Sequence, residues 1–457
     1  MDLMLILQVI VLLGAIFIGI RLGGIAIGYA GGLGVIVLGV LGLNVTTSKI
    51  AWDVILIIMA VIATISAMQL AGGLDYLVRI AEKILRSKPK YINYLAPTVT
   101  YFLTILAGTG HTAFSMIPVI VEVAKEQNIK PSAPLSIAVV ASQIAITASP
   151  VSAAVVYLTG VLEPLGWSYP LLLSIWIPTT FIACMVTAFI ITLISDLDLS
   201  KDSVYQERLK AGLVKASTGM NEAKLPKSAK TSVVIFLIGI LVIVLYATAI
   251  SKIGGVAVLI DKPTINRDSA IIGIMLIVAT LIVISSKINP NKIADTSVFK
   301  SGMTACVCVL GVAWLGSTFV SGYEDAIKTL AKNWVSAIPA ILAVVYFLAA
   351  MLLYSQAATA KAITPAVVVA LGIGTFDADG TLTVLDASSS YMIVASFAAV
   401  SALFVLPTYP TLLGAVQMDD TGTTRIGKYI FNHSFFIPGV LAIVISVAFG
   451  FLAVSFF

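Results

Sequence analysis

Long, continuous apolar runs are the feature that most limits how this chain can fold. Of its 457 residues, 59% are hydrophobic, and only 27 basic and 22 acidic side chains interrupt them. A soluble domain carries about 25% charged residues, so most of this surface faces something other than water. Because unpaired backbone amides are costly in lipid, continuous apolar runs form helices, whereas barrel strands alternate. The sequence therefore predicts an all-α integral membrane protein.

The apolar runs suffice for ten membrane-crossing helices of about 20 residues each. Two further apolar segments, 94–124 and 337–374, are each interrupted by a short polar stretch. We expect each to be a re-entrant helical hairpin, since polar backbone at membrane depth needs protein or water around it. The expected spans, of which the fourth and ninth are broken, are 3–20, 25–43, 54–70, 135–162, 171–194, 232–250, 270–286, 298–320, 391–416 and 435–457.

The distribution of basic residues predicts which loops face the cytoplasm. With the N-terminus outside, twenty of them fall on the cytoplasmic side and six outside, while Lys361 falls within the membrane. Positive residues concentrate in the cytoplasmic loops of membrane proteins, so we expect this orientation, with both termini outside. The net charge of +5 is spread over loops, so no nucleic-acid partner is predicted.

The two halves of the chain share landmarks in the same order. Residues 109–118 align with 356–365, and residues 149–152 align with 406–409. Five spans precede a central polar segment, so the second copy enters the membrane from the opposite face. This is the inverted-topology repeat that secondary transporters use, with the first hairpin opening inward and the second outward. The expected units are a first repeat at 1–195, a cytoplasmic linker at 196–230 and a second repeat at 231–457.

Four polar elements within the apolar runs form the predicted binding site. In inverted-repeat transporters, hairpin tips and broken helices bring helix N-termini together near the midplane. The four elements are rich in hydroxyls and poor in acids, and helix N-termini attract anions, so we expect a negative substrate. The candidate substrate-binding residues are Thr109, Gly110, His111 and Thr112 at the first tip, Ser149, Pro150 and Ser152 at the first break, Ser355, Gln356 and Thr359 at the second tip, and Pro407, Thr408, Tyr409, Pro410 and Thr411 at the second break.

Lys361 joins this set because it lies two residues beyond Thr359 in an otherwise apolar half-helix. An uncompensated charge at mid-bilayer costs at least ~3 kcal/mol, so the ammonium needs a partner. We expect that partner to be a carboxylate of the substrate; a protein acid such as Glu122 is the alternative. His111 could donate to a second carboxylate or cap the hairpin.

Few residues could support metal or acid–base chemistry. Three cysteines lie in apolar runs and there are only two histidines, so neither a metal site nor a cofactor is predicted. The polar segments lack paired catalytic acids and a nucleophile beside a base, which argues against an enzyme. Asp419, Asp420 and Arg425 are expected to form a solvated cytoplasmic turn, and His433 to belong to a helix start.

Seven motifs are ordered along nearly the whole chain: GGLDYLVRIAEK (72–83), LTILAGTGH (103–111), ASPVS (148–152), SQAA (355–358), LPTYP (406–410), TGTT (421–424) and NHSF (432–435). With them the sequence resembles the Dcu family of anaerobic C4-dicarboxylate transporters. The resemblance implies an inner-membrane carrier of anaerobically growing bacteria. Such a carrier exchanges external fumarate, malate or aspartate for internal succinate, or takes these acids up.

These features together predict an elevator-type secondary transporter, in which the hairpins and broken spans carry a bound dianion across a static scaffold. Electroneutral exchange for succinate is expected, because an empty unit would drag the unpaired Lys361 cation through the apolar barrier. A sodium- or proton-coupled symporter and a dicarboxylate-binding membrane sensor remain alternatives. The expected partners are small dicarboxylate anions and the lipid bilayer. The sequence leaves the oligomeric state, including a homo-oligomer, open.

Overall fold

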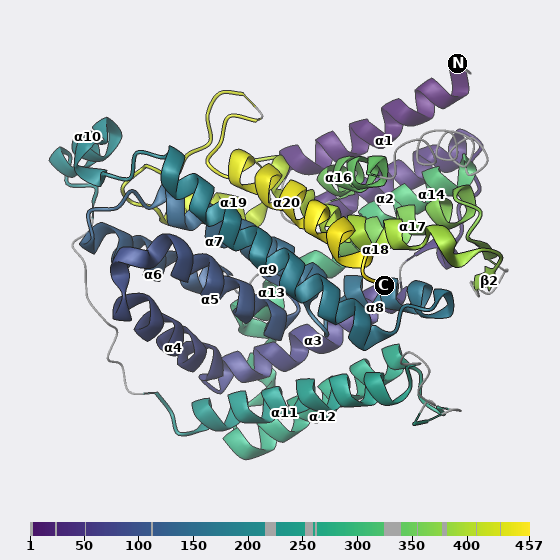
Figure 1. The fold of residues 1–457 in the computed structure, drawn as a ribbon, viewed down its shortest axis with the longest axis horizontal. Helices are drawn as coiled ribbons and strands as arrows, with labels where there is room; N and C mark the ends of the chain where they lie inside the picture. The colour runs from purple at the N-terminus through teal and green to yellow at the C-terminus, as the bar shows by residue number, and fades with distance from the viewer. Residues whose placement is uncertain are drawn as a thin grey trace.

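Figure 1 shows the chain as a bundle of helices, with α7 and α20 near its middle, α11 and α12 along one edge and α1 and α2 toward the opposite edge. The computed structural model describes residues 3–22, 25–50, 52–110, 113–214, 225–251, 259–260, 263–323, 340–353, 355–376, 382–407, 409–429 and 431–457. Three predicted site residues lie outside these ranges: His111 and Thr112 at the first tip, and Thr408 at the second break.

Most helices before the linker follow the expected apolar runs, but α4 forms outside them. They are α1 (Leu3–Leu22), α2 (Ala26–Val40), α3 (Trp52–Leu70), α4 (Gly73–Ser87), α5 (Ile92–Ala107), α6 (Ala113–Glu126), α7 (Ser132–Ala145), α8 (Ala153–Leu162) and α9 (Tyr169–Ile194). Short helical turns connect them: η1 (Thr47–Lys49), η2 (Pro89–Tyr91), η4 (Ile146–Ala148) and η5 (Glu163–Leu165).

The linker and the second half contain further helices, two strands and several turns. The helices are α10 (Ser203–Lys210), α11 (Ser228–Ala249), α12 (Arg267–Ser286), α13 (Ser297–Cys308), α14 (Trp314–Gly322), α16 (Ile341–Leu353), α17 (Gln356–Ala370), α18 (Tyr391–Ser396), α19 (Pro410–Met418) and α20 (Phe436–Val454). The turns are η6 (Leu199–Lys201), η7 (Pro290–Asp295), η9 (Ala387–Ser389) and η10 (Phe397–Val405), and a π-helical segment, η8 (Val309–Ala313), joins α13 to α14.

A small β-hairpin corrects the expectation of a purely helical chain. Strands β1 (Gly374–Phe376) and β2 (Leu382–Val384) pair antiparallel, with Thr375 opposite Thr383. They follow α17, just beyond the expected end of the second hairpin. Threonine, valine and phenylalanine favour extended backbone, and the two short strands satisfy each other's amides where the helix has ended.

Seven helical segments within the described ranges are long and apolar enough to cross a membrane. An eighth forms if α3 and α4, which meet at 77°, are one span. The remaining two of the ten expected spans correspond to α1 and α2, whose apolar stretches, Leu3–Gly19 and Ala26–Val40, are shorter. The structure thus shows a helical membrane protein with seven to eight candidate spans by length and composition, and α1 and α2 fall short of this criterion.

Each segment predicted to be a hairpin contains two helices that pack against each other, α5 with α6 in the first and α16 with α17 in the second. Gly108 ends α5 with φ of +65°, a left-handed conformation that side chains with a Cβ rarely adopt. In the second hairpin Ser355 precedes α17, and its hydroxyl accepts a hydrogen bond from the Ala358 amide at 3.2 Å. The first arm of each hairpin packs along a broken segment: α5 lies against α7, and α16 against η10.

The two broken segments form the buried centre of the molecule. In the first, α7 and η4 end before Ser149, and α8 starts again at Ala153. In the second, α18 and η10 end before Leu406, and α19 starts at Pro410. Every residue from Ala133 to Ala148 and from Met392 to Val405 is buried, so these segments meet protein on all sides.

The turn at Asp419 is solvated only in part: Arg425 is exposed as expected, but Asp419 is only 2% exposed. Its carboxylate accepts hydrogen bonds from the Thr421 amide at 3.0 Å and the Thr424 amide at 2.7 Å. The linker helix α10 covers the turn, and Arg208 donates to the carbonyl oxygen of Asp420 at 2.8 Å. The turn therefore provides its own hydrogen bonds for the buried charge.

Candidate functional site

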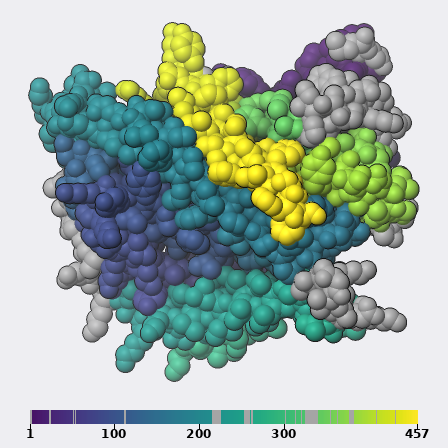
Figure 2. Space-filling model, in the orientation of Figure 1, coloured from purple at the N-terminus to yellow at the C-terminus, as the bar shows by residue number. Residues whose placement is uncertain are grey.

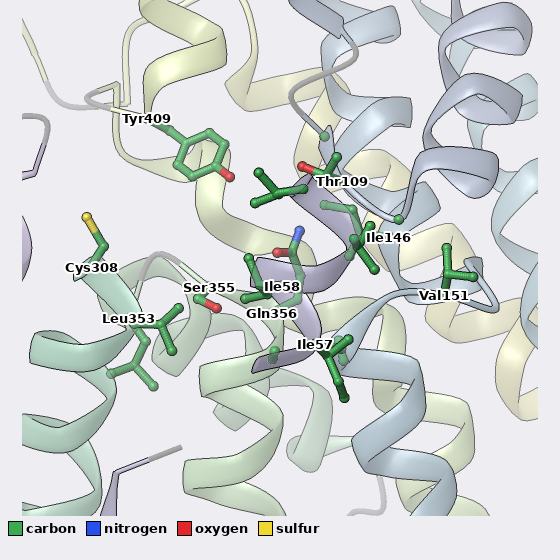
Figure 3. Close-up of a pocket in the computed structure, with 18 residues that line it drawn as sticks. Ile57, Ile58, Thr109, Ile146, Val151, Cys308, Leu353, Ser355, Gln356 and Tyr409 are labelled. Carbon is green, nitrogen blue, oxygen red and sulfur yellow. The ribbon is translucent and has the colours of Figure 1, made fainter. Parts of the chain in front are cut away.

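A cavity of about 110 Å³ lies where the two hairpin tips meet (Figure 3). Four of the helix ends predicted from the sequence contribute to its wall, together with side chains of α3 and α13. The lining residues are Ile57, Ile58, Val61, Ile62, Gly108, Thr109, Gly110, Ile146, Val151, Ala153, Ala154, Cys308, Val309, Leu353, Ser355, Gln356, Ala357 and Tyr409.

Three helices begin at this cavity. Gln356 is the first residue of α17, Ala153 is the first residue of α8, and Tyr409 immediately precedes α19. At the first tip, Gly108, Thr109 and Gly110 line the cavity. They follow the end of α5 and precede α6 in the chain. The first amides of a helix have no partner within it and carry partial positive charge, so the wall favours an anion.

The polar side chains of the wall come from both halves of the chain. Figure 3 shows the hydroxyl groups of Thr109 and Tyr409 and the amide of Gln356 directed toward the same space, with Ser355 beside them. These are four of the residues predicted from the sequence. These side chains are uncharged hydrogen-bond donors, so they can bind carboxylate oxygens without adding a negative charge to the site.

The serines of the first break lie behind the wall. The Ser149 hydroxyl donates to the Ile105 carbonyl at 2.6 Å, and the Ser152 hydroxyl donates to the Ile146 carbonyl at 2.7 Å. Ser152 also accepts from the Val155 amide, and the Pro150 carbonyl accepts from the Tyr169 hydroxyl. These side chains satisfy the amides and carbonyls that the break frees, while their neighbours Val151, Ala153 and Ala154 line the cavity.

The remaining predicted residues with described positions lie one layer away. Thr359 donates to the Ser355 carbonyl at 2.7 Å, within the first turn of α17. Thr411 is buried and accepts from the side-chain amide of Gln143 at 3.4 Å. Pro410 occupies the first position of α19, where a missing amide hydrogen costs nothing, and Pro407 lies in the preceding break.

Lys361 is not among the residues that line the cavity. It lies in the second turn of α17, and its ammonium is 6.0 Å from the centre of the Tyr157 ring on α8. Glu122, the protein acid considered as an alternative partner, forms an ion pair with Arg86 at 3.3 Å. The ammonium therefore faces an aromatic ring of the first broken segment, an arrangement that stabilises a cation away from water.

Sequence reasoning missed the apolar wall and Gln143. Ile57, Ile58, Val61 and Ile62 of α3 line the cavity, but in the sequence they resemble any lipid-facing residues. Gln143 is buried on α7, and its carbonyl oxygen accepts a hydrogen bond from the Gln356 side chain at 3.2 Å. The sequence feature that could have indicated Gln143 is that it is an isolated glutamine in a long apolar run. No group of three or more potential metal ligands occurs among the residues whose positions are described.

Comparisons with known proteins agree with this picture. The model of a family described as anaerobic C4-dicarboxylate membrane transporters matches residues 4–457. The C4-dicarboxylate transporter DcuA of Helicobacter pylori strain J99 is 62% identical over 97% of both chains, and DcuA of Wolinella succinogenes is 62% identical over 98% of this chain and 99% of its own. DcuA of Escherichia coli K12 is 54% identical over 99% of this chain and 100% of its own.

A solved structure shares the fold. The YdaH transporter of Alcanivorax borkumensis, whose structure shows an unusual topology, matches with a TM-score of 0.50 over 90% of this chain and 87% of its own. At 12% identity this likeness concerns the fold alone. The family match and the 54–62% identities, by contrast, run over nearly the full chain. The protein therefore belongs to the anaerobic C4-dicarboxylate transporter family and is a multi-pass transporter of the bacterial inner membrane rather than an enzyme.

Proposed function

We propose that this transporter exchanges an external C4-dicarboxylate such as fumarate, malate or aspartate for internal succinate, without net movement of charge. The observation that carries the proposal is the single cavity bordered by both hairpin tips, both breaks and two further helices. A wall of helix starts, hydroxyls and one carboxamide matches a small dianion, because each carboxylate can accept several hydrogen bonds.

The proposed binding groups are those that face the cavity. Thr109 and Gly110 would hold one carboxylate, and Ser355, Gln356 and Tyr409 the other. His111, Thr112 and Thr408 adjoin these residues in the chain and belong to the same proposed site. Ser149, Pro150, Ser152, Thr359, Pro407, Pro410 and Thr411 would support it by holding the helix starts in place.

Lys361 is proposed to supply the countercharge. Its ammonium lies beside Tyr157, in the second turn behind the start of α17, and not in the wall. In an apolar interior a charge acts over longer distances than in water, so the ammonium can stabilise a bound dianion without touching it. A bound dianion offsets this positive charge during the crossing, whereas an empty carrier would move the charge without the substrate, which favours exchange over one-way transport.

We infer an inverted repeat as the architecture behind this site. The proposed topology has ten spans with α1 and α2 included, two re-entrant hairpins and both termini outside. Residues 1–195 and 231–457 would form the two repeats, and residues 196–230 the cytoplasmic linker. Equivalent contacts in the two halves, α5 with α7 and α16 with η10, support the repeat.

The composition of the wall supports an elevator mechanism. One side belongs to the hairpins and broken segments, while Ile57, Ile58, Val61 and Ile62 of α3, with Cys308 and Val309, form an apolar other side. An apolar surface holds no ligand by hydrogen bonds, so it can act as the scaffold against which a loaded unit slides. Hydroxyls and amides would then travel together with the dianion.

Counterflow in proteoliposomes tests the exchange. Vesicles loaded with unlabelled succinate should accumulate labelled fumarate, and empty vesicles should not, with or without an imposed sodium or proton gradient. Uptake that needs such a gradient would indicate a symporter instead, and binding without counterflow would indicate a sensor. The same reconstitution with three- and five-carbon acids measures the length preference.

Cys308 provides a readout of cavity occupancy that does not depend on transport. Its residue lines the cavity, whereas Cys184 and Cys306 are only 1% and 4% exposed. Succinate should slow the reaction of a small maleimide with Cys308 in the purified full chain and leave the two buried thiols unchanged. Equal labelling with and without succinate would place the ligand elsewhere.

A further inference from the structure

A largely buried ion pair joins the start of α12 to the end of α8. Arg267, the first residue of α12, donates from Nη2 to Oε2 of Glu163 at 2.5 Å, and the two side chains are 8% and 23% exposed. Glu163 directly follows α8 and begins η5. Ser251, just beyond α11, donates to Glu163 and accepts from Arg267 at 3.3 Å. The ion pair therefore lies where three separate segments of the chain meet.

Each member of the pair occupies a helix end that disfavours its charge. The start of a helix carries partial positive charge, and the end carries partial negative charge. Arg267 places a cation at the start of α12, and Glu163 places a carboxylate at the end of α8. Neither charge is stabilised by its own helix, so the favourable interaction is the one between the two helices.

The pair crosses the boundary between the two parts of the proposed elevator. α12 packs against α3, and the Thr64 hydroxyl of α3 donates to the Met275 carbonyl of α12 at 2.7 Å. α12 therefore stays with α3, whose side chains form much of the apolar side of the cavity. Glu163 continues directly from α8, which belongs to the moving unit of hairpins and broken segments. Sliding of that unit along α3 would separate Glu163 from Arg267.

Further contacts lead from Arg267 to the cavity. The guanidinium carbon lies 5.2 Å from the centre of the Tyr169 ring, an arrangement that stabilises the cation. The Tyr169 hydroxyl donates to the Pro150 carbonyl at 2.8 Å, and the next residue, Val151, lines the cavity. The guanidinium thus contacts both the end of α8 and the side chain that supports the first break.

We propose that Arg267 is a positioning residue that holds the moving unit, through Glu163, in the position that the structure shows, and that release of this pair limits the rate of exchange. The inference rests on the proposed function, since it requires a unit that moves past α3. The expected topology places both residues at the outer ends of their helices. The pair would therefore stabilise one end position of the movement without contacting the substrate.

Cross-linking tests whether the contact must open. Glu163→Cys with Arg267→Cys, joined by a short bifunctional maleimide in the purified full chain before reconstitution, should lose succinate exchange in proportion to the fraction cross-linked, yet still bind labelled succinate. Trp167→Cys with Ser390→Cys is the matched control. The Trp167 indole donates to the Ser390 hydroxyl at 2.8 Å, and both residues adjoin broken segments of the moving unit. Treated identically, this pair should keep exchanging, which also accounts for any reaction of Cys308.

Neutralising the pair tests whether its release limits the rate. Glu163→Gln removes the charge at similar volume, and we expect the maximal rate of succinate exchange to rise about two- to fivefold, the range of a partly exposed ion pair. The Kd for succinate should stay unchanged, because Glu163 does not line the cavity. Arg267→Lys keeps the cation and should show a smaller rise. A contact that only stabilised the fold would give the opposite sign, since its loss lowers activity.

The outcomes separate this inference from the proposed function. Absence of succinate counterflow in the wild type would reject the exchange itself. Unimpeded exchange after cross-linking of the Glu163→Cys and Arg267→Cys pair would show that the two helices do not move apart, which would reject the elevator together with the role of the pair. Arrest after cross-linking, combined with a maximal rate of Glu163→Gln at or below that of the wild type, would leave the elevator in place and overturn only the role of the pair.

Discussion

The two hairpins differ in where they carry charge. In the first, Glu122, Lys125 and Glu126 all lie near the end of α6, far from the tip. Arg86 pairs with Glu126 at 2.6 Å and with Glu122 at 3.3 Å. In the second hairpin, Lys361 lies in the second turn of α17, close to the tip, with its ammonium over the Tyr157 ring.

We propose that this difference separates anchoring of the first hairpin from substrate recognition by the second. Charges at the far end of α6 reach partners on α4 and beyond α19, where the expected topology places them near the cytoplasmic surface. There an ion pair costs little and holds the hairpin in place. The expected topology places Lys361 within the membrane, where a cation is costly, so its position near the cavity is consistent with a function in transport. The space-filling view in Figure 2 shows one face of the molecule, on which the yellow C-terminal helix α20 crosses beside the teal residues of the first half, where it contacts α9 and α7.

The largest predicted effect distinguishes the two hairpin cations. Lys361→Met should lower succinate exchange at least ~100-fold, the rate equivalent of the ~3 kcal/mol assigned to an uncompensated charge. Lys125→Met, the matched change on the first hairpin, should lower it only a few-fold. Initial rates in proteoliposomes at equal protein content measure both. Wild-type exchange by Lys361→Met would remove the lysine from the mechanism.

The two tips offer the next comparison. Gly110 and Ala357 occupy aligned positions and both line the cavity. Gly110→Ala places a Cβ 2.4 Å from the Gln143 nitrogen, and overpacking of this kind costs about 1–3 kcal/mol. We therefore expect the KM for succinate to rise by about tenfold or more, whereas Ala357→Gly should change it by less than about fivefold, through helix propensity alone. Similar KM values for the two variants would show that the tip tolerates the methyl group.

The anchoring of the first hairpin should be measurable as a coupling energy. Lys125 and Asp420 form an ion pair at 2.9 Å, with side chains 13% and 16% exposed. A double-mutant cycle with Lys125→Met and Asp420→Asn should give a coupling of about 1 kcal/mol in the unfolding of the solubilised protein. Additive losses would mean that the pair does not anchor the hairpin.

The smallest effect concerns pH. His433 is 8% exposed, desolvation lowers its pKa from 6.5, and its Nε2 lies 3.0 Å from the Val405 carbonyl. Because the unfolded chain binds the proton more readily, stability is full above pH 6.5 and falls as the pH drops below it. Thermal unfolding between pH 7.5 and 5.5 should show this slope in the wild type and a weaker one in His433→Gln. Parallel slopes would assign the pH dependence to other groups.

Much of the candidate site could be predicted from the sequence. Thr109, Ser355, Gln356 and Tyr409 were expected together because polar tips and prolines interrupt apolar runs only where the chain reverses or breaks. Ser149 and Ser152 were expected to face the ligand, but the break needs their hydroxyls for its own carbonyls. Asp419 was expected in water, yet the threonine amides that follow it made burial possible.

The amino-acid sequence by itself determined that the chain lies in a membrane as helices, and where those helices break, because burying unpaired amides in lipid is prohibitive along any single segment. Only the tertiary structure decided which side chains share one cavity. The direction of each side chain depends on the packing of helices from opposite ends of the chain. Gln143 meets Gly110, Gln356 and Thr411 only after α7, both hairpin tips and α19 have come together.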